Sequence, residues 1–126
     1  LYVPLNSPGV THEAAADFAL AVGQVLERQL ADRVTTVMAK AVRPGKIFID
    51  WSQNAFHKTT IAPYSLRARP DPTVSTPVTW SEVEACAAGT GGLRFVSDDV
   101  LERVERDGDL FAEVLTREQT LPVLGG

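Results

Sequence analysis

The sequence predicts an α+β fold: a mostly antiparallel sheet, a long amphipathic helix packed on it and small helices toward the C-terminus. Apolar residues recur at helical spacing over residues 12–31, whereas residues 46–51 and 58–62 are short runs typical of strands. The chain has 126 residues and is 44% hydrophobic, which is enough for one core and too short for two ordinary domains. We therefore expect a single unit over residues 1–126.

The first strand and the long helix are expected to follow one another closely. The strand at residues 1–5, LYVPL, is interrupted by Pro4 and followed by turn-prone residues 6–9. Thr11 is the expected N-cap of the helix over residues 12–31, because its hydroxyl can accept a hydrogen bond from the first helical turn. We expect this helix to cover the sheet.

The two remaining strands are expected to form a hairpin. Residues 46–51, KIFIDW, follow a turn at residues 43–45. Residues 58–62, KTTIA, come after a loop at residues 53–57. A short extended piece is also expected at residues 34–38.

Small helices are expected after an extended segment. Residues 63–77 contain four prolines, which disfavour a helix there. Thr79 opens a capping-box pattern, Thr-x-x-Glu, and with it a short helix. Ser97 is the expected cap of a further helix that Gly108 ends, and a marginal helical turn is expected at residues 110–115.

Composition limits the classes of function. A formal charge of -4 and an isoelectric point near 5.1 give no overall basic character, so nucleic-acid binding has to come from a local patch. The single cysteine, Cys86, cannot form an internal disulfide, and no paired cysteines suit structural zinc. No apolar run approaches the roughly 20 residues of a membrane span. We expect a soluble, cytoplasmic protein without a membrane partner.

An acidic residue ends the most apolar of the predicted strands. Asp50 directly follows Ile47, Phe48 and Ile49. A carboxylate on such a rigid support is typical of Mg²⁺ or Mn²⁺ ligands in phosphoryl-transfer enzymes. No second acid lies near it in the sequence, so spacing alone favours the alternative, a structural or solvated aspartate at the rim of a sheet.

Basic residues flank the predicted hairpin on both sides. If its strands pair, these side chains gather into a local phosphate-binding face. Arg67 and Arg69 suit this role well, because a guanidinium presents a planar fork to phosphate. Tyr64 offers a ring for base stacking. The alternative is a solvated loop with a few exposed cations. The six basic residues are Lys40, Arg43, Lys46, Lys58, Arg67 and Arg69.

Several segments together resemble the polymerase domain of bacterial DNA ligase D. They are LYVPL at residues 1–5, K-x-x-R-x-G-K-I-F-I-D-W-S-Q-N at residues 40–54, TTIAPYSLRARP at residues 59–70, PVTWSEV at residues 77–83 and DGDL at residues 107–110. That domain is one of the primase-polymerases of the archaeo-eukaryotic primase superfamily and serves non-homologous end joining. The resemblance implies a partial primase-polymerase fold.

The resemblance also implies an activity and a site. Such domains are template-dependent nucleotidyltransferases that fill gaps and extend ends, favour ribonucleotides and Mn²⁺, and recognise a 5′-phosphate on DNA. Three aspartates hold the catalytic metals, Mn²⁺ or Mg²⁺, and Asp50 matches the third. The residues implied to line the nucleotide and phosphate region are Gln53, Arg67, Arg69, Ser65 and Lys40.

This chain departs from the family pattern at its start. The family's DxD pair and its serine and histidine motif precede the segment that matches LYVPL. We therefore expect the C-terminal half of a polymerase domain, with one metal ligand of three and little or no activity by itself. The alternative is a truncated paralogue that acts as a non-catalytic DNA-binding or dimerising module. On DNA, either form would be associated with the nucleoid.

Overall fold

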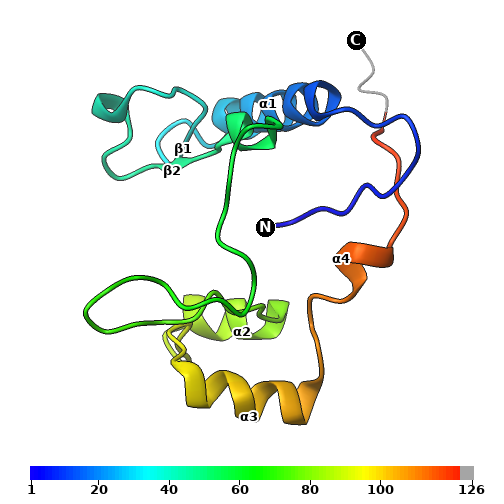
Figure 1. Ribbon diagram of the computed structural model, residues 1–126. Coiled ribbons are helices and arrows are strands. Elements are labelled where there is room, and N and C mark those ends of the chain that lie inside the picture. The colour runs from blue at the N-terminus through cyan, green and yellow to red at the C-terminus, as the bar shows by residue number, and fades with distance from the viewer. Residues whose placement is uncertain (123–126) are drawn as a thin grey trace. The chain divides into compact units, whose positions relative to one another are not determined.

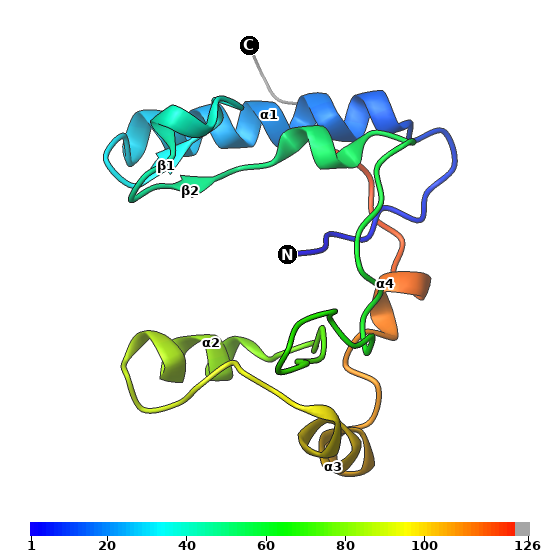
Figure 2. The same ribbon diagram turned by 60° about the vertical axis from the view of Figure 1, so that its left-hand side comes forward.

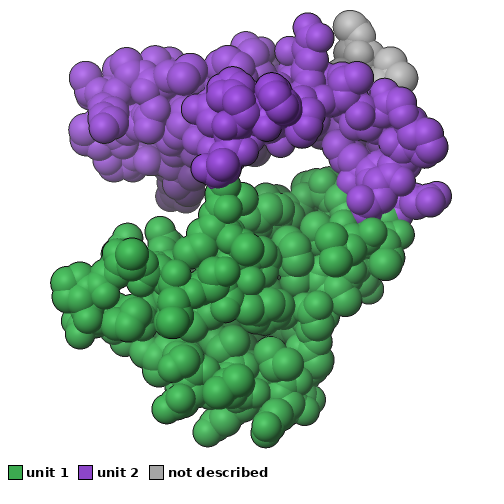
Figure 3. All heavy atoms as spheres, viewed as in Figure 1, with its two compact units in different colours: residues 1–4, 60–117 green, residues 5–59, 118–126 purple. Residues whose placement is uncertain are grey.

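The computed structural model describes residues 1–122, which divide between two compact units (Figure 3). Unit 1 consists of Leu1–Pro4 and Thr60–Arg117. Unit 2 consists of Leu5–Thr59 and the residues from Glu118 onward. The expectation of a single unit stays a prediction, and each unit is described by itself below.

Unit 2 is organised around the long helix that the sequence predicts. Helix α1 spans His12–Gln29, and the Thr11 hydroxyl accepts a hydrogen bond of 3.1 Å from the backbone N–H of Ala14. Figures 1 and 2 both show α1 running alongside the short strands and the 3-10 helix that follows them. The amphipathic helix and its cap are thus confirmed.

The sheet of unit 2 is small and parallel. Strand β1, Val34–Thr35, pairs with strand β2, Ile47–Phe48. The connection between them contains a 3-10 helix, η1, at Lys40–Val42. Backbone hydrogen bonds of 2.7 Å from Ile47 N–H to Arg33 O and 2.9 Å from Ile49 N–H to Thr35 O join the two segments.

The mostly antiparallel sheet is not confirmed, because the sheet found among the described residues is parallel. Residues 1–5 and 58–62 form no strand there. The predicted hairpin fails because its second arm uses its backbone groups locally. Lys58 N–H donates to Ala55 O at 2.9 Å in a turn, and the Gln53 side chain donates to Thr59 O at 2.8 Å.

A close approach between α1 and the strand segment forms the core of unit 2. Gly23 of α1 is buried, and a Cβ added there would lie 2.7 Å from Thr36 Cγ2 and 3.1 Å from Ile49 Cγ2. The Glu27 carboxylate accepts hydrogen bonds of 3.0 Å from the Thr35 hydroxyl and 2.6 Å from the Thr36 hydroxyl. Glycine at position 23 therefore sets how closely the segment leading to Asp50 packs on the helix.

Unit 1 contains the short helices expected in the second half of the chain. They are α2 at Trp80–Ala87, α3 at Ser97–Asp107 and α4 at Glu113–Thr116. The capping box before α2 is confirmed, since Thr79 N–H donates to Glu82 Oε2 at 2.8 Å and Glu82 N–H donates to Thr79 Oγ1 at 3.3 Å.

The start of α3 differs from the prediction by one residue. Ser97 is the first helical residue, and Val96 takes the N-cap position. Val96 N–H donates to Asp99 Oδ2 at 2.8 Å, so this aspartate performs the capping that was expected of the serine. Gly108 ends the helix with φ of 73°, as the sequence predicts.

An arginine lies at the centre of unit 1. Arg103 is 8% exposed, and both ends of its guanidinium bond to the Glu82 carboxylate, one of them also donating to Pro77 O at 3.1 Å. Its Cζ lies 4.7 Å from the centroid of the Phe95 ring. The Arg103 guanidinium lowers the pKa of Glu82 to about 2. This ion pair joins α2 to α3.

None of the helices within residues 1–122 combines the length and the apolar character needed to cross a membrane.

Candidate functional site

The structure places Asp50 at the end of the segment that β2 begins. It is the N-cap of a second 3-10 helix, η2, at Trp51–Asn54, and its side chain is exposed. The Ser52 hydroxyl donates a hydrogen bond of 2.8 Å to Asp50 Oδ1. One carboxylate oxygen is thus oriented by a neighbour, and the carboxylate is accessible.

The η2 segment is tied to the rest of unit 2 by polar contacts. The Trp51 indole N–H donates to Thr36 O at 3.2 Å, and His12 Nδ1 lies 3.1 Å from Asn54 O. The Gln53 side chain is exposed, and its amide reaches Thr59 O. Gln53 therefore holds the chain that leaves η2 toward residue 59.

The described residues do not by themselves form a cluster of metal ligands. Among residues 1–122, no group of three or more His, Cys, Asp or Glu side chains could hold a metal ion. Asp50 fits Mn²⁺ or Mg²⁺ as one oxygen ligand, because hard cations prefer carboxylates on rigid supports. Further carboxylates are required for a complete two-metal site.

The two predicted arginines lie on a narrow antiparallel ribbon in unit 1, which we call the arginine ribbon and define as residues 64–75. Leu66 and Val74 form an antiparallel bridge across it. Its two arms are joined by backbone hydrogen bonds of 2.6 Å from Tyr64 N–H to Ser75 O, 2.9 Å from Ser75 N–H to Ser65 O and 2.8 Å from Arg67 N–H to Thr73 O. Arg67 is thus on an arm, and Arg69 is near the tip.

The arginine side chains of the ribbon are accessible. Arg67 and Arg69 are both exposed, whereas Ser65 is half-buried. Within the described part of the chain, neither guanidinium forms an ion pair with a carboxylate. Both arginines are therefore free to bind an anionic ligand.

The predicted residues divide between the two units. Asp50, Gln53 and Lys40 lie in unit 2, and Lys40 is exposed at the first position of η1. Ser65, Arg67 and Arg69 lie in unit 1. The convergence of the two groups on one nucleotide stays a prediction.

Two cations of the proposed basic face have partners inside unit 2. The Arg43 guanidinium lies 3.7 Å from the centroid of the Phe48 ring and donates to Met38 O. Lys46 Nζ donates to Ala31 O at 2.6 Å. Both side chains stabilise the turn before β2 in addition to any contact with phosphate.

Sequence reasoning missed one side-chain contact next to the ribbon. The Tyr64 hydroxyl donates a hydrogen bond of 2.6 Å to Asp109 Oδ1. Asp109 belongs to the DGDL segment, which carried no assigned role, and 45 positions separate the two residues. No spacing rule connects side chains that far apart in the sequence.

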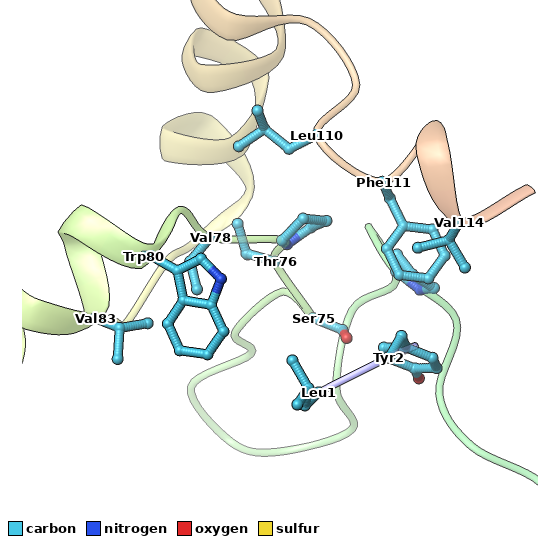
Figure 4. Close-up of a pocket in the computed structure, with 12 residues that line it drawn as sticks. Leu1, Tyr2, Ser75, Thr76, Val78, Trp80, Val83, Leu110, Phe111 and Val114 are labelled. Atoms are coloured by element: carbon cyan, nitrogen blue, oxygen red, sulfur yellow. The ribbon is translucent and has the colours of Figure 1, made fainter. Parts of the chain in front are cut away.

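Unit 1 also contains a pocket of about 400 Å³ with largely apolar walls (Figure 4). Tyr2 and Phe111 meet there edge to face, with ring centroids 5.1 Å apart, and Trp80 lies on another wall. None of the six predicted site residues lines this pocket. The pocket and the arginine ribbon share Ser75, the last residue of the ribbon, whereas Arg67 and Arg69 lie outside the pocket.

Comparison with known proteins identifies relatives over most of the chain. A family model described as the LigD primase-polymerase domain matches residues 1–111. A multifunctional non-homologous end joining protein LigD of Mycobacterium bovis is 50% identical over 111 residues, which is 87% of this chain and 14% of that protein. A bifunctional LigD of Bacillus subtilis is 30% identical over 123 residues, 98% of this chain and 20% of that protein.

A solved structure is similar as well. It is the polymerase domain of Mycobacterium tuberculosis ligase D in complex with DNA, with a TM-score of 0.81 and 43% sequence identity. The match covers 92% of this chain and 39% of that domain. The chain therefore spans less than half of the solved domain and a small part of the full-length relatives.

Proposed function

The chain belongs to the LigD primase-polymerase family, and on that premise we propose that it carries one catalytic carboxylate and the phosphate-binding arginines of a DNA repair polymerase. The reaction is template-dependent nucleotidyl transfer, which fills gaps and extends ends in bacterial non-homologous end joining. Its partners are DNA with 5′-phosphate ends and nucleoside triphosphates, and it acts in the cytoplasm on nucleoid DNA. The solved relative's complex with DNA supports this assignment.

The observation that carries the proposal is the position of Asp50. Its exposed carboxylate directly follows a segment whose backbone is bonded to β1, and Ser52 orients one of its oxygens. Metal ligands in phosphoryl-transfer sites need this combination of rigid support and accessibility. The exposed guanidiniums of the arginine ribbon supply the matching chemistry for phosphate.

Each residue then has a distinct task. Asp50 would hold Mn²⁺ or Mg²⁺, which when bound stabilises negative charge on the phosphoryl oxygens. Arg67 and Arg69 would donate hydrogen bonds to the triphosphate and neutralise the charge that develops as pyrophosphate leaves. The side chains proposed to line the rest of the nucleotide region are Gln53, Ser65 and Lys40.

We expect the chain alone to extend primers weakly or not at all. A single carboxylate leaves most of the coordination sphere of two cations without protein ligands. In the family pattern, the DxD pair and the serine and histidine motif come before the segment that this chain matches. Activity should therefore require those motifs to be supplied.

The test is Mn²⁺-dependent primer extension with ribonucleotides on a gapped duplex bearing a 5′-phosphate. The chain is assayed alone and as a chimera, in which its residues 1–111 replace the matching segment of the Mycobacterium bovis polymerase domain. The chimera should extend the primer, and Asp50→Ala should lower its rate by about 100-fold or more.

The matched control is Asp32→Ala, which removes another exposed carboxylate from unit 2 and should leave the rate unchanged. Arg67→Ala should raise the KM for the nucleotide by roughly tenfold, because a charge-assisted contact to the triphosphate is lost. Equal extension by the Asp50→Ala and unsubstituted chimeras would show that Asp50 is not a metal ligand.

A second function, a dimerising or DNA-binding module without catalysis, is favoured by exposed apolar side chains. Phe56 is 82% exposed in unit 2, and Ile47 is 65% exposed on β2. An uncovered strand edge with apolar side chains promotes self-association. Sedimentation over a range of concentrations tests this directly: a homodimer supports the module, and a monomer that leaves DNA unbound contradicts it.

A further inference from the structure

The conformation of Tyr64 is unusual for its residue type. Its φ is 65°, and it is the only non-glycine residue with a positive φ among residues 1–122. A side chain with a Cβ rarely adopts this left-handed region, so surrounding contacts have to hold it there. Such strain often occurs where a protein has to fix the direction of a functional segment.

The contact that holds Tyr64 is well defined. Its hydroxyl donates to Asp109 Oδ1 at 2.6 Å, and the same oxygen accepts a hydrogen bond of 2.8 Å from the backbone N–H of Phe111. Asp109 is therefore fixed by its own turn before it binds the tyrosine. The hydrogen bond from Tyr64 lowers the pKa of Asp109, because it favours the ionised carboxylate.

Tyr64 is also the first residue of the arginine ribbon. Its backbone N–H donates to Ser75 O at 2.6 Å, which closes the base of the two arms. Arg67 follows three positions later, where its N–H donates to Thr73 O, and Arg69 lies beyond it toward the tip. The direction of the chain at Tyr64 therefore affects where the backbone of Arg67 and Arg69 lies.

We propose that Tyr64 and Asp109 are positioning residues, which tether the base of the arginine ribbon so that Arg67 and Arg69 are preorganised for a triphosphate. The inference rests on the phosphate-binding role proposed above for the two arginines. Bidentate binding of phosphate needs guanidiniums of fixed direction, because freedom lost on binding reduces affinity. The Tyr64–Asp109 hydrogen bond reduces the conformational freedom of the ribbon before the triphosphate binds, without contacting the triphosphate.

The variants that test the tether are conservative. Tyr64→Phe removes only the hydroxyl, and Asp109→Asn removes only the charge of the acceptor. Each has a matched control in unit 1: Tyr2→Phe removes a phenol whose ring packs on Phe111, and Asp107→Asn removes a carboxylate that pairs with Arg106. The probe is ATP with Mg²⁺, titrated into the isotope-labelled chain while the backbone signals of residues 64–75 are followed by NMR.

The two tether variants should weaken ATP binding by about fivefold and speed hydrogen exchange at the N–H groups of Arg67 and Ser75. The two controls should stay within about twofold of the wild type. The double variant Tyr64→Phe, Asp109→Asn should bind ATP no more weakly than Tyr64→Phe alone, because the two substitutions act on the same hydrogen bond. Thermal unfolding of each variant separates lost affinity from a lost fold.

The outcomes distinguish the tether from the function on which it rests. If Arg67→Ala weakens ATP binding and the tether variants do not, the tether is wrong and the phosphate role stands. If Arg67→Ala leaves ATP binding unchanged, or if neither the chain nor the chimera binds millimolar ATP, the phosphate role is wrong and the tether variants have no ligand binding to affect. Faster hydrogen exchange and weaker ATP binding in the control variants, with neither in the tether variants, would also overturn the proposal.

Discussion

The Asp50 segment of unit 2 and the arginine ribbon of unit 1 are held in place in different ways. Asp50 follows a segment that is bonded to β1 through the backbone and packed on α1 at Gly23. The ribbon is joined to its surroundings by hydrogen bonds between residues far apart in the sequence, from the Tyr64 hydroxyl to Asp109 and from Val74 N–H to Phe95 O. A sterically packed support and a hydrogen-bonded support should respond differently to substitution.

The chain offers a separate reporter for each unit. It contains two tryptophans, and Trp51 lies in unit 2 whereas Trp80 lies in unit 1. Their indole N–H signals therefore report on the two units independently in a single NMR sample. During urea unfolding, the Trp51 signal measures the stability of unit 2 and the Trp80 signal measures that of unit 1.

The largest effect is expected from Arg103→Ala, which should destabilise unit 1 by about 3 kcal/mol. The substitution leaves Glu82 and the Pro77 carbonyl without the partner that joins α2 to α3. The Trp80 signal should then report unfolding at a lower urea concentration, while the Trp51 signal changes little. Arg106→Ala on the same helix is the control, because its side chain is 64% exposed.

A result in which both reporters shift equally after Arg103→Ala would show that the two units unfold as one. The Asp50 segment and the arginine ribbon would then be parts of a single cooperative structure.

The second effect is a loss of stability of unit 1 in acid. Arg103 lowers the pKa of Glu82 from its ordinary value of 4.5 to about 2. The folded state therefore binds the proton less readily than the unfolded chain, and the stabilisation is complete above pH 4.5 and lost as the pH falls toward 2. Glu82 is partly exposed, so solvent weakens the ion pair. We therefore expect the free energy of unfolding of unit 1 to fall by about 2 kcal/mol.

Urea unfolding at several pH values, followed at Trp80, measures this loss. The control is Glu82→Gln, which should be less stable at neutral pH and should lose the part of the pH dependence that comes from the ion pair. If the free energy of unfolding changes equally with pH in the wild type and the variant between pH 4.5 and 2, the Glu82–Arg103 pair does not account for the loss of stability in acid.

The smallest effect concerns unit 2. An alanine in place of glycine normally stabilises a helix by up to about 1 kcal/mol. We expect Gly23→Ala to do the opposite and destabilise unit 2 by about 1 kcal/mol, because its Cβ would lie 2.7 Å from Thr36 Cγ2. The Trp51 signal measures the change. Gly92→Ala in unit 1, whose Cβ would meet nothing within 4 Å, is the control and is followed at Trp80. Stabilisation of unit 2 by Gly23→Ala would mean that the helix and the strand segment separate without cost.

The sequence predicted the elements whose signals are local. The helix after Thr11, the capping box at Thr79 and the stop at Gly108 each depend on a few neighbouring residues, and the structure confirms all three. The predicted hairpin was wrong, because the strand that pairs with residues 46–51 is not determined by the neighbouring sequence. Ile47 and Phe48 pair with β1 in parallel.

The site residues follow the same rule. Asp50 is recognisable because a strand end and an acid are adjacent in the sequence, and the arginines because two guanidiniums are two positions apart. The residues that support them are Gly23, Tyr64 and Asp109, whose roles appear only once distant segments lie side by side.

The division of unit 1 between Leu1–Pro4 and Thr60–Arg117 bears on the order of folding during synthesis. The Tyr2 ring packs against Phe111, so this contact cannot form until a residue much later in the sequence has been made. Residues 5–59 of unit 2 have no such delay and can pack α1 on the β1 and β2 segments as soon as they emerge. The segment that presents Asp50 can therefore mature first, with the arginine ribbon completed only after the DGDL turn has left the ribosome.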